Sequence, residues 1–173
     1  MPHVWIGPPQ DFEDVGTYVF RRTFARADLG DQNAIKVTAD PRYRLYLNGQ
    51  LISIGPARGD AMHWPIGEVN LSEALKEGQN ILHAVVWNHG NLAGLAQVSH
   101  RTGFLVEHPE IGTPSEWEVA VLVGIAPTED TINWRPTYRV ASATITVGSD
   151  ESAFGDLADP DRLGRELSWF EPV

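Results

Sequence analysis

The sequence of 173 residues contains no cysteine. No disulfide bond can form in it, and no thiol is available as a nucleophile. It also has no apolar run long enough to cross a bilayer. The first ten residues, MPHVWIGPPQ, lack a charged segment followed by an apolar one. We therefore expect no signal peptide and a cytoplasmic location, with a secreted protein that has lost its signal as the alternative.

Positive charge is scarce. Thirteen Lys and Arg stand against 23 Asp and Glu, which gives a formal net charge of −10. An acidic chain without a basic cluster repels phosphate backbones, so nucleic acid is not expected as a partner, and neither is a membrane. Hydrophobic residues make up 42% of the chain, a proportion typical of a folded globular protein.

Signals for metals and cofactors are weak. No pair of the six histidines has the spacing that puts two ligands on one helical face. The acidic stretches 28–33 (DLGDQN) and 156–161 (DLADPD) carry oxygens that suit calcium, but neither matches the EF-hand pattern. We expect solvated loops and no cofactor, with a structural calcium ion as the alternative.

Catalytic motifs are also missing. There is no Gly-x-Ser-x-Gly elbow, and GPARGD lacks the Lys-Ser/Thr ending of a phosphate loop. Glycoside hydrolysis needs two carboxylates on rigid elements, and none of the 23 acids stands out by its position. We expect no catalytic residue in this chain.

The dominant pattern is β. Alternating or continuous apolar runs predict strands within 16–27, 33–40, 81–88 and 103–108, with two more within 116–127 and 143–150. YRLYLNGQLISIG predicts a hairpin, because Asn48-Gly49 favours a type I′ turn. Residues 70–80 differ: Asn70 or Ser72 can cap a short helical turn that Gly78 ends.

About eight strands at this spacing predict an all-β fold, an antiparallel jelly-roll β-sandwich of the galactose-binding-domain-like type. One short helical turn is expected near residues 71–77. The sandwich is expected to span residues 1–148. Residues 149–173 form an acidic, loop-rich tail, which we interpret as the start of a linker to a missing domain.

Aromatic and polar loop residues suggest sugar binding, since a protein binds sugars by stacking an aromatic ring and offering planar polar groups. The candidates fall in two stretches, GPARGDAMHW and WNHGN: Arg58, Asp60, His63 and Trp64, and Trp87, Asn88 and His89. In the alternative, both tryptophans plug the core, and Arg58 and Asp60 brace each other. Gly55 and Gly59 are expected to supply backbone freedom. The Arg58-Gly59-Asp60 tripeptide also occurs in adhesion ligands, but a tripeptide has a high false-positive rate.

Several ordered pieces carry a family resemblance. VTADPRYRLYLNGQLISIGPARGDAMHW, VNLSEALKEGQNILHAVVWNHG and AQVSHRTGFLVE closely resemble the N-terminal β-sandwich region of bacterial α-L-rhamnosidases, from about Val4 to about Glu107. The resemblance implies a galactose-binding-like jelly roll that packs on other domains, with the catalytic acids on a separate helical barrel. A chain of 173 residues cannot hold that barrel.

Together these observations predict a non-catalytic carbohydrate-binding or accessory module of a rhamnosidase-like glycoside hydrolase. Its expected partners are a glycan and other domains or a catalytic chain of the same enzyme. Three alternatives remain: a structural interaction module without sugar affinity, a glycosidase in its own right, and an adhesion protein.

Overall fold

The computed structural model describes residues 4–12, 14–90, 93, 98–122, 126–127, 145–146 and 167–173. Ten strands and one 3₁₀ helix, η1, occur in these residues. Their bounds are β1 Gly16–Ala25, η1 Arg26–Leu29, β2 Ala34–Asp40, β3 Arg42–Leu47, β4 Gln50–Gly55, β5 Gly67–Asn70, β6 Gln79–Asn88, β7 Gly103–Glu107, β8 Glu118–Val121, β9 Ala126–Pro127 and β10 Ile145–Thr146.

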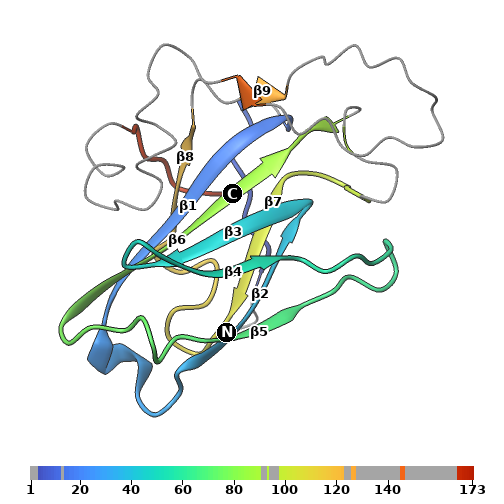
Figure 1. Ribbon diagram of the computed structural model, residues 1–173. Coiled ribbons are helices and arrows are strands. Elements are labelled where there is room, and N and C mark those ends of the chain that lie inside the picture. Colours follow the sequence, from blue (N-terminus) through green and yellow to red (C-terminus); the bar gives the residue numbers. More distant parts are fainter. Residues whose placement is uncertain are drawn as a thin grey trace.

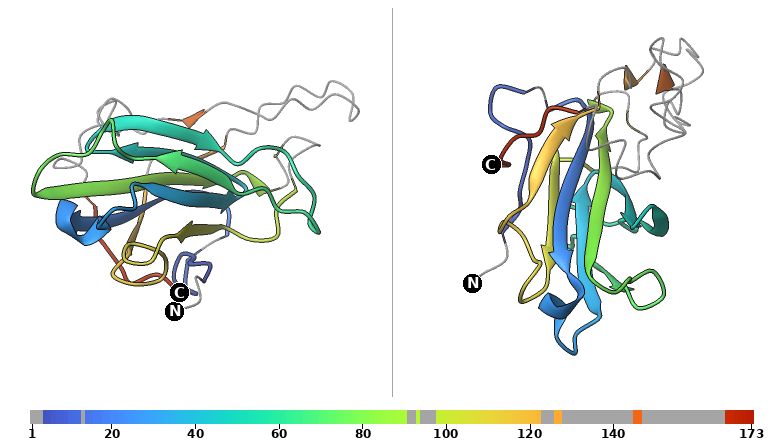
Figure 2. Two further views of the ribbon diagram at one scale, coloured as in Figure 1. Left: turned by 90° about the horizontal axis from the view of Figure 1, so that it is seen from below. Right: turned by 90° about the vertical axis from the view of Figure 1, so that its left-hand side faces the viewer.

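The longer strands form two antiparallel sheets that face each other (Figure 1, Figure 2). One sheet has the order β4-β3-β6-β1-β8 and the other has the order β5-β2-β7, while β9 and β10 pair separately. The main core lies between the two sheets, where Phe20, Tyr43 and Leu45 of the larger sheet pack with Val37 and Phe104 of the smaller one. The antiparallel β-sandwich expected from the sequence is confirmed.

The predicted hairpin is present and has the predicted turn. β3 and β4 pair with a register shift between Leu45 and Tyr46, and Asn48 and Gly49 join them with φ values of 52° and 85°. The Asn48 amide also donates to the Asn80 side chain, at 2.8 Å, and its oxygen accepts from the Ile81 N–H. The turn is thereby fixed to the start of β6.

Residues 71–77 contain a single hydrogen-bonded turn. Leu75 N–H donates to the Leu71 carbonyl at 3.1 Å, the Asn70 side chain accepts from Ser72 N–H, and Gly78 follows with a φ of +79°. The helix that occurs among the described residues is η1. The sequence pattern had predicted that the first strand extends into this segment, as far as Ala27. Strand β5 was not predicted, because four residues with one buried side chain give almost no alternation.

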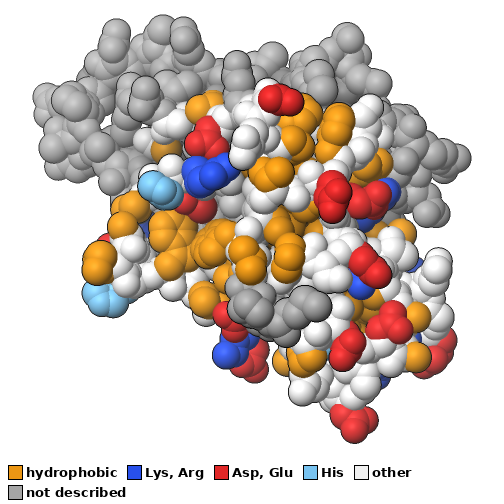
Figure 3. Space-filling view, turned by 180° about the vertical axis from the view of Figure 1, so that it is seen from behind, with side chains coloured by type: hydrophobic (Ala, Val, Ile, Leu, Met, Phe, Trp, Pro, Cys, Tyr) orange, Lys and Arg blue, Asp and Glu red, His pale blue; other side chains and the backbone are white. Residues whose placement is uncertain are grey.

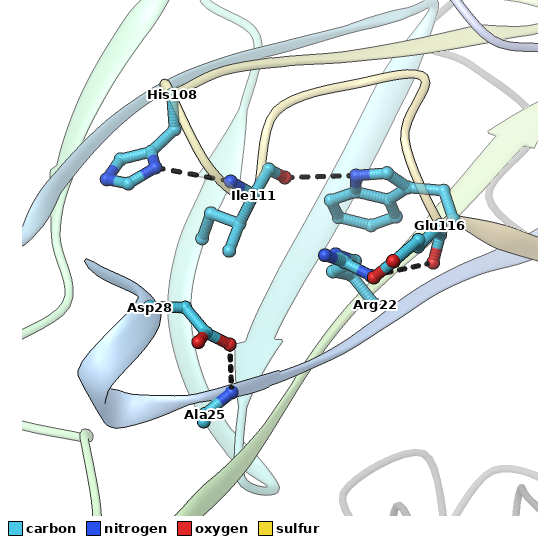
Figure 4. Close-up of polar contacts among 7 residues, drawn as sticks. Arg22, Ala25, Asp28, His108, Ile111 and Glu116 are labelled. Atoms are coloured by element: carbon cyan, nitrogen blue, oxygen red, sulfur yellow. Dashed lines mark hydrogen bonds and ion pairs between the residues drawn. The ribbon is translucent and has the colours of Figure 1, made fainter.

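The loop between β7 and β8 closes one end of the core (Figure 4). The buried Trp117 donates its indole N–H to the Ile111 carbonyl at 3.1 Å, and the His108 ring accepts the Ile111 N–H. Arg22 forms an ion pair with Glu116. These contacts bring β8 alongside β1.

The last seven residues lie against the larger sheet. Phe170 bridges Val119 of β8 through two backbone hydrogen bonds, and the Arg21 guanidinium lies 3.7 Å from the ring centroid of Trp169. Val173 exchanges backbone hydrogen bonds with Gly7. Residues 147–166 lie outside the described part, so the division at residue 148 stays a prediction.

Candidate functional site

A small hollow lies where the β2–β3 junction meets the loop that joins β4 to β5. Its lining includes three prolines, two cations and one indole: Pro41, Pro56, Pro65, Arg42, Arg58 and Trp64. Val98, from the segment that precedes β7, completes the wall. Its cavity volume is about 30 Å³, which is the share of one water molecule in the liquid. The hollow can therefore take one substituent group, and a sugar ring would have to lie across its rim.

Asp60 shapes the loop that carries the hollow. Its carboxylate accepts the N–H groups of Met62 and His63, at 2.8 and 2.9 Å, and contacts the His63 ring at 3.1 Å. The His63 side chain, followed by the Met62 N–H, holds the pKa of the exposed Asp60 carboxyl below its ordinary value. Asp60 and His63 thus close a turn of the Asx type.

The two glycines of this stretch serve close packing. A Cβ at Gly59 would come within 2.5 Å of Pro65 Cδ and 2.6 Å of the His63 carbonyl, and a Cβ at Gly55 would lie 2.6 Å from the Tyr43 ring. Neither glycine has a positive φ. The expectation that they supply backbone freedom is wrong at both positions: the side chain would have no room.

Trp64 is half-buried. Its ring meets the Trp5 ring edge to face at a centroid distance of 5.9 Å. Its indole Nε1 is shut away from solvent and has no acceptor among the described residues. Trp64 is neither a fully open platform nor a fully buried plug.

The two arginines of the hollow keep free donors. Arg42 donates from Nη1 to the Pro56 carbonyl at 3.0 Å, and the exposed Arg58 has no hydrogen bond or ion pair in the described part of the chain. The alternative in which Arg58 braces Asp60 is wrong, since His63 and the backbone engage that carboxylate.

The second predicted stretch divides between two faces of the larger sheet, because neighbouring strand residues point to opposite sides. Asn88 is buried, and its amide nitrogen lies 3.2 Å from the Thr102 hydroxyl and 3.5 Å from that of Ser99. Trp87 is half-buried and stands directly opposite Arg42 in the register, so these two side chains leave the same face. The structure thus places Trp87 beside the hollow's arginine and turns Asn88 inward.

His89 follows directly after β6 and is half-buried. Burial lowers the pKa of its ring below the ordinary value. Its Nδ1 is enclosed without a hydrogen-bond partner among the described residues. Sugar contact by His89, as by Asp60, His63, Trp87 and Asn88, stays a prediction.

A larger groove runs along the three-stranded sheet, with a volume of about 280 Å³. Lys36 lies in it, directly opposite Glu68 and Glu107 in the register, with its Nζ 3.9 Å from Glu107. The groove has no Trp, Tyr or Phe in its lining, so the Trp64 hollow is the better candidate for sugar binding.

The described part of the structure offers neither a metal cluster nor a membrane-spanning helix. No group of three or more His, Asp or Glu side chains there could hold a metal ion. Asp28, in one proposed calcium loop, accepts the Ala25 N–H at 2.7 Å, and 156–161 lies outside the described residues. No helix in the described ranges is long and apolar enough to span a membrane.

Comparison with known proteins gives a fold. No protein-family model and no curated protein matches the chain. Among solved structures, the GH78 family rhamnosidase of Bacillus sp. GL1 matches with a TM-score of 0.61 and 23% identity, over 72% of this chain and 14% of that chain. The α-L-rhamnosidase from Dictyoglomus thermophilum matches with a TM-score of 0.55 and 14% identity, over 71% of this chain and 17% of that chain.

The chain has the fold of a β-sandwich region of α-L-rhamnosidases. The β-sandwich that the sequence resemblance implied is confirmed, and the chain spans 14% and 17% of the length of these two enzymes. Seven lining residues were missing from the predicted site: Pro41, Arg42, Pro56, Ala57, Gly59, Pro65 and Val98. Arg42 could have been found from its place next to the hairpin. Val98 comes from a distant segment and gave no local signal.

Proposed function

We propose that this chain is a non-catalytic carbohydrate-binding module of a rhamnosidase-like glycoside hydrolase. The observation that carries the proposal is the half-exposed Trp64 ring beside the unpaired Arg58 guanidinium on one small hollow. A ring with an apolar face and a planar donor group are the two elements that sugar recognition requires. The fold shared with part of the rhamnosidases supports the same assignment.

In this proposal the sugar lies across the rim of the hollow. Its C–H face packs on the exposed part of the Trp64 ring, and one ring substituent enters the hollow. Arg58 donates hydrogen bonds to the sugar oxygens, since its guanidinium has five N–H groups and no partner among the described residues. Trp87 lies beside the site, because it stands directly opposite Arg42 in the strand register.

The proposal that the module is non-catalytic rests on the absence of acidic side chains from the lining of the hollow. None of the residues that line the hollow is an Asp or Glu. The acid of the same loop, Asp60, is engaged in its own turn by Met62 and His63. Two carboxylates on either side of a glycosidic bond are needed for hydrolysis, and this site offers none in its lining.

Isothermal titration calorimetry with rhamnose, galactose and plant-glycan fragments tests the proposal. We expect weak binding that Trp64→Ala reduces at least about tenfold. Trp169→Ala is the matched control, because it removes another half-buried indole, which packs on the larger sheet beside Arg21. Absence of heat with every sugar, or equal losses in both variants, would contradict the proposal.

A structural module that packs on other domains is the second candidate. Ten large apolar side chains of the described residues are exposed by 41% or more, among them Val4, Trp5, Met62, Ile66 and Val98. The space-filling view from behind shows hydrophobic side chains gathered across the face seen there (Figure 3). Such a side marks a contact surface when it is contiguous. Analytical sedimentation of the parent chain, Met62→Lys and Val98→Lys tests this second candidate. It predicts that the parent chain self-associates and that the introduced lysine charges abolish the self-association.

A further inference from the structure

We propose that the hollow beside Trp64 receives a carboxylate, so that the ligand is a glycan containing a hexuronate. This inference rests on the proposed carbohydrate-binding function and names the class of sugar. It follows from three features of the hollow: its charge, its unsatisfied donors and its size.

The charge of the hollow is opposite to that of the chain. The formal net charge is −10, yet both ionisable side chains in the lining, Arg42 and Arg58, are cations. Neither arginine forms an ion pair with an acid in the described part of the structure. A small positive site on an acidic protein favours an anionic group over a neutral one.

The acids nearest in sequence, Asp40 and Asp60, form no ion pair with either arginine. Asp60 accepts the Met62 and His63 N–H groups. The buried Asp40 accepts the N–H groups of His100 and Arg101, at 2.7 and 3.1 Å, through one of its oxygens. Both carboxylates are thus held by the backbone, and the guanidinium of Arg58 has no partner of its own.

The hollow has donors and too few acceptors. Arg42 uses one N–H on the Pro56 carbonyl, and Arg58 uses none in the described part of the chain. A carboxylate has two oxygens with about four lone-pair sites, and it matches the planar fork of an arginine.

The size of the hollow selects one group rather than a whole ring. A volume of about 30 Å³ accommodates a single small substituent. A carboxylate attached to a sugar ring can enter it while the ring stays on the rim over Trp64. A hydroxymethyl group has a similar size but only one oxygen, and it would leave the arginine donors to water.

The test compares two forms of one ligand by calorimetry: galacturonate and glucuronate oligosaccharides, each as the free acid and as its methyl ester. The ester keeps the sugar and its linkage, removes the charge and adds one methyl group. We expect at least one free acid to bind about tenfold or more tightly than its ester at low salt. The difference should shrink as ionic strength rises from about 0.02 to about 0.5 M, because both arginines are accessible to solvent.

Substitutions of arginine test which side chain causes the preference for the free acid over its ester. Arg58→Gln should abolish most of it, and Arg58→Lys should retain only part, since a lysine keeps the charge and loses the fork. Arg44→Gln is the matched control: Arg44 is an exposed arginine on β3 that does not line the hollow, and its loss should leave the preference unchanged.

Each outcome separates the two proposals. Equal binding of acid and ester, with both dependent on Trp64, would overturn the hexuronate inference and leave the carbohydrate-binding function standing. Binding of no sugar in either form would overturn both. A preference that survives Arg58→Gln but disappears in Arg44→Gln would also overturn the inference.

Discussion

The rings of Trp5 and Trp64 meet edge to face, with their planes at 86°. Trp5 also lies over Gly103 at the start of β7, where an added Cβ would approach its ring to 3.0 Å. The neighbouring Ile6 bridges Phe104 through two backbone hydrogen bonds. A segment outside the long strands therefore links the smaller sheet to the loop that carries the hollow, and it holds one side of Trp64.

Replacing Trp5 should weaken the site without touching a lining residue. We expect Trp5→Ala to lose at least about 0.5–1.5 kcal/mol of stability with the aromatic pair and to reduce sugar affinity several-fold, because Trp64 loses its support. Phe12→Ala removes a comparable pair with Phe170, whose rings are 5.1 Å apart. It should reduce stability while leaving affinity intact; unchanged affinity in Trp5→Ala would contradict the positioning role.

Gly59 should tolerate no side chain. Gly59→Ala forces its Cβ against Pro65 and the His63 carbonyl, and we expect a loss of about 1–3 kcal/mol in chemical denaturation. Gly67→Ala is the control, since its nearest neighbours are 3.7 and 3.8 Å away, an ordinary contact distance. Equal stability of the two variants would mean that the loop adjusts without strain.

The Asn48–Asn80 pair should be among the most sensitive polar sites. Asn80 is fully buried; its oxygen accepts from Asn48 and Lys76 N–H, and its nitrogen donates to the carbonyls of Lys76 and Gly78. Asn80→Ala leaves these groups unpaired and should reduce the free energy of unfolding by about 2–3 kcal/mol. The exposed Asn70, which caps a turn, should cost less when replaced by alanine. A smaller loss for Asn80 than for Asn70 would refute this ranking.

His89 should make stability fall with acid. Burial lowers its pKa below the ordinary value of 6.5, so the folded chain binds the proton less readily than the unfolded chain. Above that ordinary value both states are neutral at His89; below it the unfolded state gains a proton first, and the free energy of unfolding decreases. Urea denaturation between about pH 7 and 5 should show a shallower decrease for His89→Gln than for the parent or for His100→Gln, on the exposed 98–101 segment. An unchanged slope in His89→Gln would rule out this contribution.

Local sequence signals predicted most of the sandwich. Asn48-Gly49 determined the hairpin because both residues adopt the positive φ that the turn requires. The apolar run of β6 and the alternation of β2 both predicted strands correctly. In the structure β6 pairs with β1, and β2 pairs with β7. Strand β5 was missed because a four-residue strand gains its stability from pairing with β2 rather than from its own pattern.

The candidate site was predicted only in part, because its geometry depends on long-range packing. Arg58 and Trp64 were recognised from one loop and do line one hollow. The contact of Trp64 with Trp5, and the contribution of Val98, join segments that no local pattern connects. The separation of Trp87 from Asn88 followed from strand alternation and could have been derived from the sequence.

The central claim is that a sugar binds at Trp64, and the indole N–H resonances of a ¹⁵N-labelled chain report on it directly. The Trp64 signal is assigned by its loss in Trp64→Phe, and the Trp117 signal serves as reference, because that N–H is buried on the Ile111 carbonyl. On titration with oligosaccharides, with hexuronates included, we predict that the Trp64 signal moves saturably while the Trp117 signal stays in place. A Trp64 signal that does not move with any sugar would contradict the account.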